Sequence, residues 1–295
     1  MDRKRSSLWG FVISMTLFGT IGLFVKYIPL SSSLIALSRA LIGFLFLAAM
    51  MLIQKKKLMV SVIRKNILPL TLSGVFLGFN WILLFESYRY TSVAISTLCY
   101  YLAPLLVVLL SPLVLKEKLT QRKILCVAAS LVGMVFISGI LQADTFTAKD
   151  FTGILLGLGA AVLYAAIMIL NKKISGLSGY ERTVFQLGLS AMVLIPYCLF
   201  TCDFVSVDLN AVQIILLVIV GVIHTGLTYF LYFGAMDHLS SQTVAMLSYI
   251  DPVIAVLISV FILAEPMKLL DIPGAVLILG AAIVSELPER KKADK

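Results

Sequence analysis

The sequence predicts an all-α integral membrane protein with ten transmembrane helices, arranged as two inverted five-helix repeats. Three observations support this fold class: an apolar composition, ten apolar runs of helix length, and a repeat that relates the two halves. Of the 295 residues, 60% are hydrophobic and 13% are charged, and the mean hydropathy is +1.04. Soluble domains carry about 25% charged residues, so this composition belongs to the membrane class.

Ten stretches could cross a membrane, because a transmembrane helix needs about 20 predominantly apolar residues. They are 8–27, 34–53, 67–88, 92–114, 124–141, 151–171, 181–201, 211–235, 240–263 and 269–286. Short polar connections join them, and none is long enough for a soluble domain. The chain therefore divides into a first repeat at 1–142, a second repeat at 149–287 and a basic cytoplasmic tail at 288–295.

The basic residues predict the orientation. With a cytoplasmic N-terminus, all but five of the 24 Lys and Arg residues fall in cytoplasmic segments; the five are Lys26, Arg39, Arg89, Lys149 and Lys268. This bias follows the positive-inside rule and places both termini in the cytoplasm of a multi-pass protein of the plasma membrane. The net charge of +9 arises from these clusters beside the spans, so we expect no nucleic-acid partner.

A single shift relates the two halves. The segment YLAPLLVVLLSPLVLKE at 101–117 aligns with YIDPVIAVLISVFILAE at 249–265, and Tyr, Pro and Glu all keep register. These segments are the fourth and ninth spans. Because each half has an odd number of spans, they cross in opposite directions and the halves are inverted copies. Inverted repeats are typical of alternating-access transporters, whose substrate site lies near the membrane midplane.

Two ionisable residues fall at that depth. Asp251 lies beside Pro252, which breaks the ninth helix as Pro104 breaks the fourth. Charged groups inside spans are costly and usually functional. Asp251 is therefore a candidate proton-coupling acid or counter-ion for a substrate amine, with His224 as its candidate partner. The alternatives are that Asp251 bonds nearby backbone and that a neutral His224 bonds a neighbouring helix.

Polar and aromatic residues at the same depth could line a substrate site for an amine or aromatic solute, through stacking and cation–π contacts. The alternative is that they pack helices. The candidates are Asn80, Trp81, Tyr100, Tyr101, Tyr229, Ser248 and Tyr249.

Charged residues also gather near the predicted outer ends of the spans. Glu86 and Arg89 are three residues apart and can pair. Arg39 could snorkel outward or join Glu86 and Arg89 in an outer gate. Glu117 and Glu265 close the two repeats, where we expect each to hold a loop or a neighbouring helix end.

The segments APLLVVLLSPLVLKEKLT and DPVIAVLISVFILAEP, the ten spans and Arg39 in the second span resemble the EamA family of the drug/metabolite transporter superfamily. The resemblance covers essentially the whole chain, most clearly 78–137 and 224–285, so each repeat is EamA-like. It implies a ten-helix transporter fold with a central cavity between the halves. It also implies movement of metabolites, amino acids or drugs, frequently outward.

The sequence therefore predicts a secondary transporter that exports small metabolites, amino acids or drug-like solutes by alternating access, with proton coupling as an option. The alternative is a passive channel or facilitator. We expect no enzyme, because GxSxG and HExxH motifs are missing, and no ATP-driven pump, because no GxxxxGK[ST] motif occurs. The expected partners are a small-molecule substrate and the lipid bilayer, without metal or cofactor; the oligomeric state stays open.

Overall fold

The computed structural model describes residues 2–55, 60–114, 120–137, 141, 147–203, 209–236, 238–239 and 247–287, which are helical without strands. The first half holds α1 (Asp2–Lys26), α2 (Ser32–Ile53), α3 (Val60–Lys65), α4 (Ile67–Tyr90), α5 (Val93–Tyr100), α6 (Ala103–Val114) and α7 (Gln121–Ile137). The second half holds α8 (Ala148–Lys173), α9 (Gly179–Thr201), α10 (Ala211–Gly221), the π-helix η1 (Val222–Leu227), α11 (Thr228–Met236), α13 (Ile250–Phe261) and α14 (Asp271–Glu286).

Among the described residues, seven helical stretches are long and apolar enough to cross a membrane, and α13 and α14 add shorter apolar helices. Each predicted apolar run contains at least one helix of the described chain. The multi-pass, all-helical prediction is therefore confirmed. The count of ten spans stays a prediction, because α7, α13 and α14 have 17, 12 and 16 described residues.

Large apolar side chains face outward, as a lipid environment allows. Leu52 is 77% exposed, Phe200 90% and Leu269 84%. Buried apolar residues form a larger cluster among α1, α2, α4 and α9 and a second cluster among α5, α6, α7 and α14. A helix with both a buried and an exposed apolar face has the distribution expected of a membrane bundle, where lipid covers the outside.

The fourth span breaks where the sequence predicts. Tyr101 and Leu102 form a turn between α5 and α6, and Pro104 is the second residue of α6. In the other half α13 begins at Ile250, so Pro252 also lies in a first helical turn. Proline fits there because the first turn does not need its missing N–H group. The two helix breaks therefore occupy matching places in the repeat.

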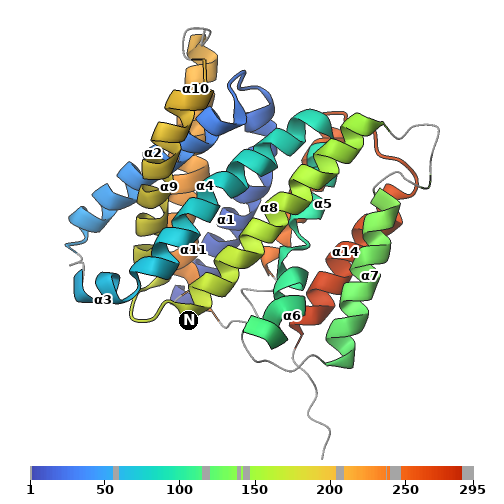
Figure 1. Ribbon diagram of the computed structural model, residues 1–295, viewed down its shortest axis with the longest axis horizontal. Coiled ribbons are helices and arrows are strands. Elements are labelled where there is room, and N and C mark those ends of the chain that lie inside the picture. The colour runs from blue at the N-terminus through green and yellow to red at the C-terminus, as the bar shows by residue number, and fades with distance from the viewer. Residues whose placement is uncertain are drawn as a thin grey trace, which may run out of the picture.

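Helix packing follows the inverted repeat. If the helices of each half are matched in chain order, α1 corresponds to α8, α4 to the α10–η1–α11 helix, and α7 to α14. The contact between α4 and α8 then has its counterpart in the contact between α1 and α11. Helices α2 and α9 pack against each other, as do α7 and α14, so each meets its own counterpart. Figure 1 shows α4 beside α8 and α7 beside α14.

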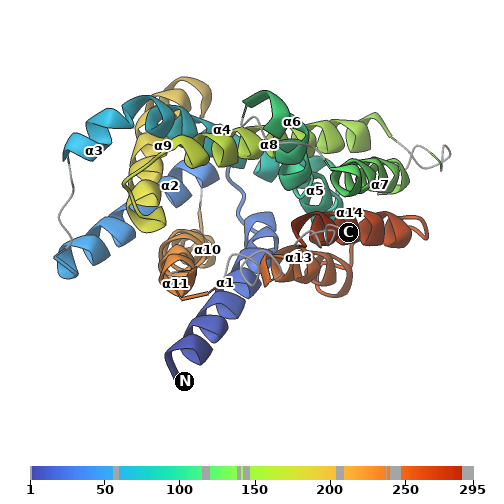
Figure 2. The same ribbon diagram turned by 90° about the horizontal axis from the view of Figure 1, so that it is seen from below.

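The two halves are interleaved rather than separate. Helix α1 of the first half packs on α11 and α13 of the second, and Figure 2 shows it lying next to both. Conversely, α8 of the second half packs on α4, α5 and α6. A movement of one half against the other must therefore change the contacts of α1 and α8.

A glycine contact between α2 and η1 gives a test of this packing. A Cβ atom at Gly43 would lie 2.4 Å from Cγ2 of Thr225. We expect Gly43→Ala to destabilise the protein by about 1–3 kcal/mol through overpacking. The measurement is the melting temperature of the detergent-solubilised protein. The same substitution at Gly280, where a Cβ meets nothing within 4 Å, is the control and should leave the melting temperature unchanged. Equal effects at both positions would contradict the close α2–η1 contact.

Candidate functional site

The two helix breaks are joined by a hydrogen bond between the halves. The hydroxyl of Tyr101, in the turn between α5 and α6, donates to Oδ2 of Asp251 in the first turn of α13. Tyr249, the repeat counterpart of Tyr101, is buried, and its ring centroid lies 6.5 Å from that of Tyr101. The structure thus brings together three of the predicted site residues from both halves.

Helix α1 covers this junction at close range. A Cβ atom at Gly19 would lie 2.6 Å from the carbonyl oxygen of Asp251 and 2.7 Å from Cβ of Ile254. The missing side chain therefore lets the backbone of α1 approach α13 directly beside Asp251, as small residues do between membrane helices.

Arg39 points into the bundle. Its side chain is 5% exposed, its guanidinium carbon lies 4.0 Å from the ring centroid of Trp81, and its Nε donates to Oγ1 of Thr225 at 2.9 Å. The snorkelling alternative is wrong, because a cation–π contact and a hydroxyl acceptor replace water around the cation. These contacts also do not bring Arg39 to Glu86.

Arg39 also lies within electrostatic range of the helix break. Its ionisable neighbours are, from the strongest interaction to the weakest, Tyr229, Tyr100, Tyr88 and Asp251. Arg39 is buried, whereas Asp251 is half-buried. Each is held by uncharged groups: Thr225 and Trp81 for Arg39, and Tyr101 for Asp251.

His224 lies in the π-helical turn η1 and is 1% exposed. Its Nε2 lies 2.8 Å from Oγ1 of Thr20 on α1, its Nδ1 lies 3.4 Å from the carbonyl of Ile219, and its ring centroid is 4.6 Å from that of Phe24. The structure thus places His224 against a neighbouring helix rather than beside Asp251. Single π-helical turns are frequent at functional sites, and this one presents His224 to α1 and Thr225 to α2.

The remaining candidates surround the junction. Asn80 is fully buried and donates through Nδ2 to the carbonyl of Ala160 at 2.6 Å, while the hydroxyl of Tyr100 lies 3.5 Å from Oδ1 of Asn80. The ring of Tyr100 stacks on Tyr164 with centroids 5.0 Å apart. Ser248 is half-buried in the segment before Tyr249.

Tyr229 belongs to a separate aromatic group. Its ring stacks on Phe233 with centroids 5.9 Å apart and meets the edge of Phe18 at 5.2 Å.

The sequence analysis did not identify Tyr164, Thr20 and Thr225 as neighbours of the site residues. The first two lie on α8 and α1, the helices that cross between the halves.

Glu86 and Arg89 pair as predicted, with a 3.6 Å contact within α4. Ser32 donates to Glu86 at 2.5 Å, and Arg89 donates to the carbonyl of Leu30 at 3.3 Å. These contacts all lie within the first half. They connect α4 to the start of α2 and do not bridge the halves, as a gate would require.

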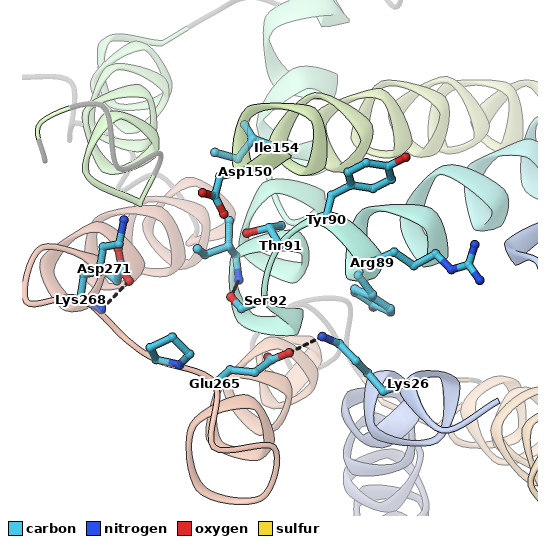
Figure 3. A pocket seen from close by; sticks show the side chains of 13 residues that line it. Lys26, Arg89, Tyr90, Thr91, Ser92, Asp150, Ile154, Glu265, Lys268 and Asp271 are labelled. Atoms are coloured by element: carbon cyan, nitrogen blue, oxygen red, sulfur yellow. Dashed lines mark hydrogen bonds and ion pairs between the residues drawn. The ribbon is translucent and has the colours of Figure 1, made fainter. Parts of the chain in front are cut away.

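A cavity of about 380 Å³ opens at the same end of the bundle. Figure 3 shows its wall, to which both halves contribute; the residues include Lys26, Arg89, Thr91, Ser92, Asp150, Glu265, Lys268 and Asp271. We call this cavity the vestibule. It lies at the predicted outer ends of the spans, away from the Tyr101–Asp251 junction.

Glu265 fulfils its predicted structural role. Its Oε2 accepts a hydrogen bond from the backbone N–H of Val93, the first residue of α5, at 2.8 Å. Ala264 has a φ of +49°, a left-handed conformation that costs a non-glycine residue on the order of 1 kcal/mol and turns Glu265 back onto the end of α13. Its counterpart Glu117 lies outside the described residues.

The described part of the chain holds no cluster of three His, Cys, Asp or Glu residues suited to a metal.

Arg39 offers a test of the buried cation. We expect Arg39→Lys to destabilise the protein by about 1–3 kcal/mol, because an ammonium group on a flexible stem replaces the stacked guanidinium and its bond to Thr225. The melting temperature in detergent is the measurement. The control is Arg89→Lys, at a side chain that is 52% exposed, which should change it by far less. An unchanged melting temperature for both variants would mean that Trp81 does not hold the cation.

The chain is similar to known transporter proteins over nearly its whole length. The EamA-like transporter family matches residues 5–139 and 151–286, one match for each repeat. An uncharacterized transporter, YxxF, of Bacillus subtilis (strain 168) is 32% identical over 99% of this chain and 93% of its own. An uncharacterized transporter of Archaeoglobus fulgidus is 26% identical over 93% of this chain and 94% of its own.

A third relative, the protein PecM of Dickeya dadantii, is 26% identical over 68% of this chain and 67% of its own. A solved crystal structure covers 96% of this chain and 97% of its own with a TM-score of 0.63 and 18% identity, which supports the fold alone. With two family matches that together span nearly the whole sequence, the chain belongs to the EamA-like transporter family.

Proposed function

We propose that the protein is a secondary transporter that exports a small solute across the plasma membrane by alternating access. One observation carries this proposal: each half contributes its helix break to one half-buried junction, where Tyr101 binds Asp251. A site shared by two inverted repeats can be opened to either face when the halves rock against each other. The exported solute is a small metabolite, an amino acid or a drug-like amine.

The charges around the junction support a solute with a protonated amino group. Asp251 is a half-buried carboxyl group whose described hydrogen bond comes from a neutral hydroxyl. An ammonium group would supply the opposite charge that a buried carboxylate needs. The Arg39 cation lies in the same buried region and suits an anionic or electron-rich group at the other end of the solute.

Aromatic surfaces border the same region and fit the apolar part of such a solute. Tyr100 stacks on Tyr164, and Tyr249 lies beside Tyr101. An offset or edge contact with an aromatic ring contributes about 0.5–1.5 kcal/mol, and a cation over a ring face about 0.5–2 kcal/mol. We therefore assign Asn80, Trp81 and these four tyrosines either to direct contact with the solute or to the support of residues that contact it.

The bond between Tyr101 and Asp251 suggests how solute and proton compete. Tyr101 occupies only Oδ2 of Asp251, so an ammonium group or a proton can bind at Oδ1. Either event compensates the negative charge of the acceptor and weakens the bond that joins the two helix breaks. Occupancy of Asp251 is thereby coupled to the contact between the halves, which is what a coupled transporter requires.

Two substitutions test this assignment once an uptake and efflux screen has named a transported solute. We expect Asp251→Asn to reduce counterflow in proteoliposomes by about 10–100-fold, since a hydrogen bond to a charged group contributes about 1.5–3 kcal/mol. It should also remove the pH dependence of the rate. Tyr101→Phe keeps the carboxyl group and should retain transport with a changed pH dependence.

The controls are Asp150→Asn, a carboxyl group in the vestibule wall, and Tyr27→Phe, whose side chain is 59% exposed. Both should transport at the unsubstituted rate. Counterflow itself separates a carrier from a passive channel, because only a carrier exchanges labelled solute faster against an unlabelled pool on the far side. An Asp251→Asn variant with unchanged rate and pH dependence would remove both roles proposed for this carboxyl group.

A further inference from the structure

We propose that Lys26 and Glu265, with Ser259 and the start of α5, form a latch that holds the predicted outer face of the transporter closed. This inference rests on the proposed alternating access. It replaces Glu86, Arg89 and Arg39 as the outer gate. Glu86 and Arg89 make their described contacts within the first half, and Arg39 joins the halves through Thr225 inside the bundle rather than at the vestibule.

A single carboxylate joins three helix ends. Oε1 of Glu265 lies 2.5 Å from Nζ of Lys26, at the end of α1. Oε2 accepts from the N–H of Val93 at 2.8 Å and from Oγ of Ser259 at 2.5 Å. Ser259 in turn accepts from the N–H of Ala94 at 3.2 Å. Helices α1 and α5 belong to the first half and α13 to the second, so these bonds connect the halves.

The latch lies between the vestibule and the Tyr101–Asp251 junction. Lys26 and Glu265 form part of the vestibule wall, where Figure 3 shows their ion pair facing the cavity. From Ser259 to Asp251 is eight residues along α13, or about 12 Å of helix. A solute in the vestibule therefore meets the ion pair before it can reach the buried carboxyl group.

Beneath the ion pair, α1 lies in close contact with both α5 and α13. A Cβ atom at Gly22 would lie 2.5 Å from Cγ1 of Val93, and one at Gly19 would lie 2.7 Å from Cβ of Ile254. The backbone of α1 is thus pressed against α5 near the latch and against α13 near Asp251. A path from the vestibule to Asp251 requires α1 to separate from α13, and the ion pair opposes that separation.

The latch has the exposure expected of a contact that forms and breaks. The side chain of Lys26 is 29% exposed and that of Glu265 is 12% exposed, so water can replace the partners of both groups. A fully buried pair would be too costly to separate into two unpaired charges. The ion pair between Glu86 and Arg89 lies at the same end but within one helix, so its loss frees no helix from another.

The test measures access to the α1–α13 interface without requiring transport. Cysteine replaces Ile254 in a chain whose four native cysteines are alanine, and a membrane-impermeant maleimide is applied to the outer face of intact cells. Labelling should be slow with the latch intact. We expect Lys26→Met and Glu265→Gln each to speed it by about tenfold, because the labelling rate follows the population of the open state.

Glu265→Gln keeps an oxygen for the N–H of Val93 and removes the charge that faces Lys26, so it separates the ion pair from the helix-end bond. The matched control is Arg89→Met, which removes a vestibule cation and should leave labelling unchanged. A cysteine at Ala165, which is 1% exposed on α8, reports general unfolding and should stay unlabelled in every variant.

The outcomes separate the latch from the proposed function. Faster labelling at Ile254→Cys in the Lys26 and Glu265 variants, with Ala165→Cys protected, supports the latch. Unchanged labelling in both variants, or an equal rise with Arg89→Met, would overturn it. Counterflow decides independently whether the protein is a transporter, so a working carrier with unchanged labelling rejects the latch alone. Altered labelling without any counterflow rejects the proposed function alone.

Discussion

Lipid offers no hydrogen-bonding partner, so a helix that breaks inside a bilayer must have its freed backbone groups satisfied by protein. At the first break the turn satisfies freed groups locally, because the N–H of Tyr101 donates to the carbonyl of Thr97 and that of Leu102 to the carbonyl of Cys99. The turn at Tyr101 and the first turn of α13 meet across the repeat through Asp251, and α1 covers them at Gly19. Tyr100, Tyr164 and Asn80 fill the space on the α4 and α8 side. The positions of Tyr100, Tyr249 and Asn80 follow from this shared break.

The buried charges impose a second condition. Arg39 comes from the first half and Asp251 from the second, and in this conformation hydroxyl groups and an aromatic ring serve as their partners. Neutral partners leave part of the cost of withdrawing a charge from water uncompensated. In the proposed function, each charge can exchange its neutral partner for a group on a solute, and Asp251 can instead take up a proton.

The sequence predicted what depends on local pattern. Apolar run length located the helices, Pro104 and Pro252 located the breaks, and register in the repeat predicted that Glu265 would hold a helix end. It left alternatives open where the answer depends on how helices rotate against one another. His224 turns to Thr20 because the chain forms a π-helical turn at Val222–Leu227, and Arg39 turns inward because Trp81 and Thr225 lie on adjacent helices. Neither fact has a signature in residue spacing.

The pair Ala103 and Asp251 shows where the inverted symmetry stops. Ala103 is fully buried against Ala161 and Ala165 of α8, so the first-half break is packed tightly onto a second-half helix. At the matching place in α13, Asp251 accepts the Tyr101 hydroxyl beside the glycine surface of α1. In the proposed function, symmetric helices expose the same junction to either face of the membrane. A solute bound there would meet a negative charge from the second half alone, because the counterpart of Asp251 in the first half is an alanine.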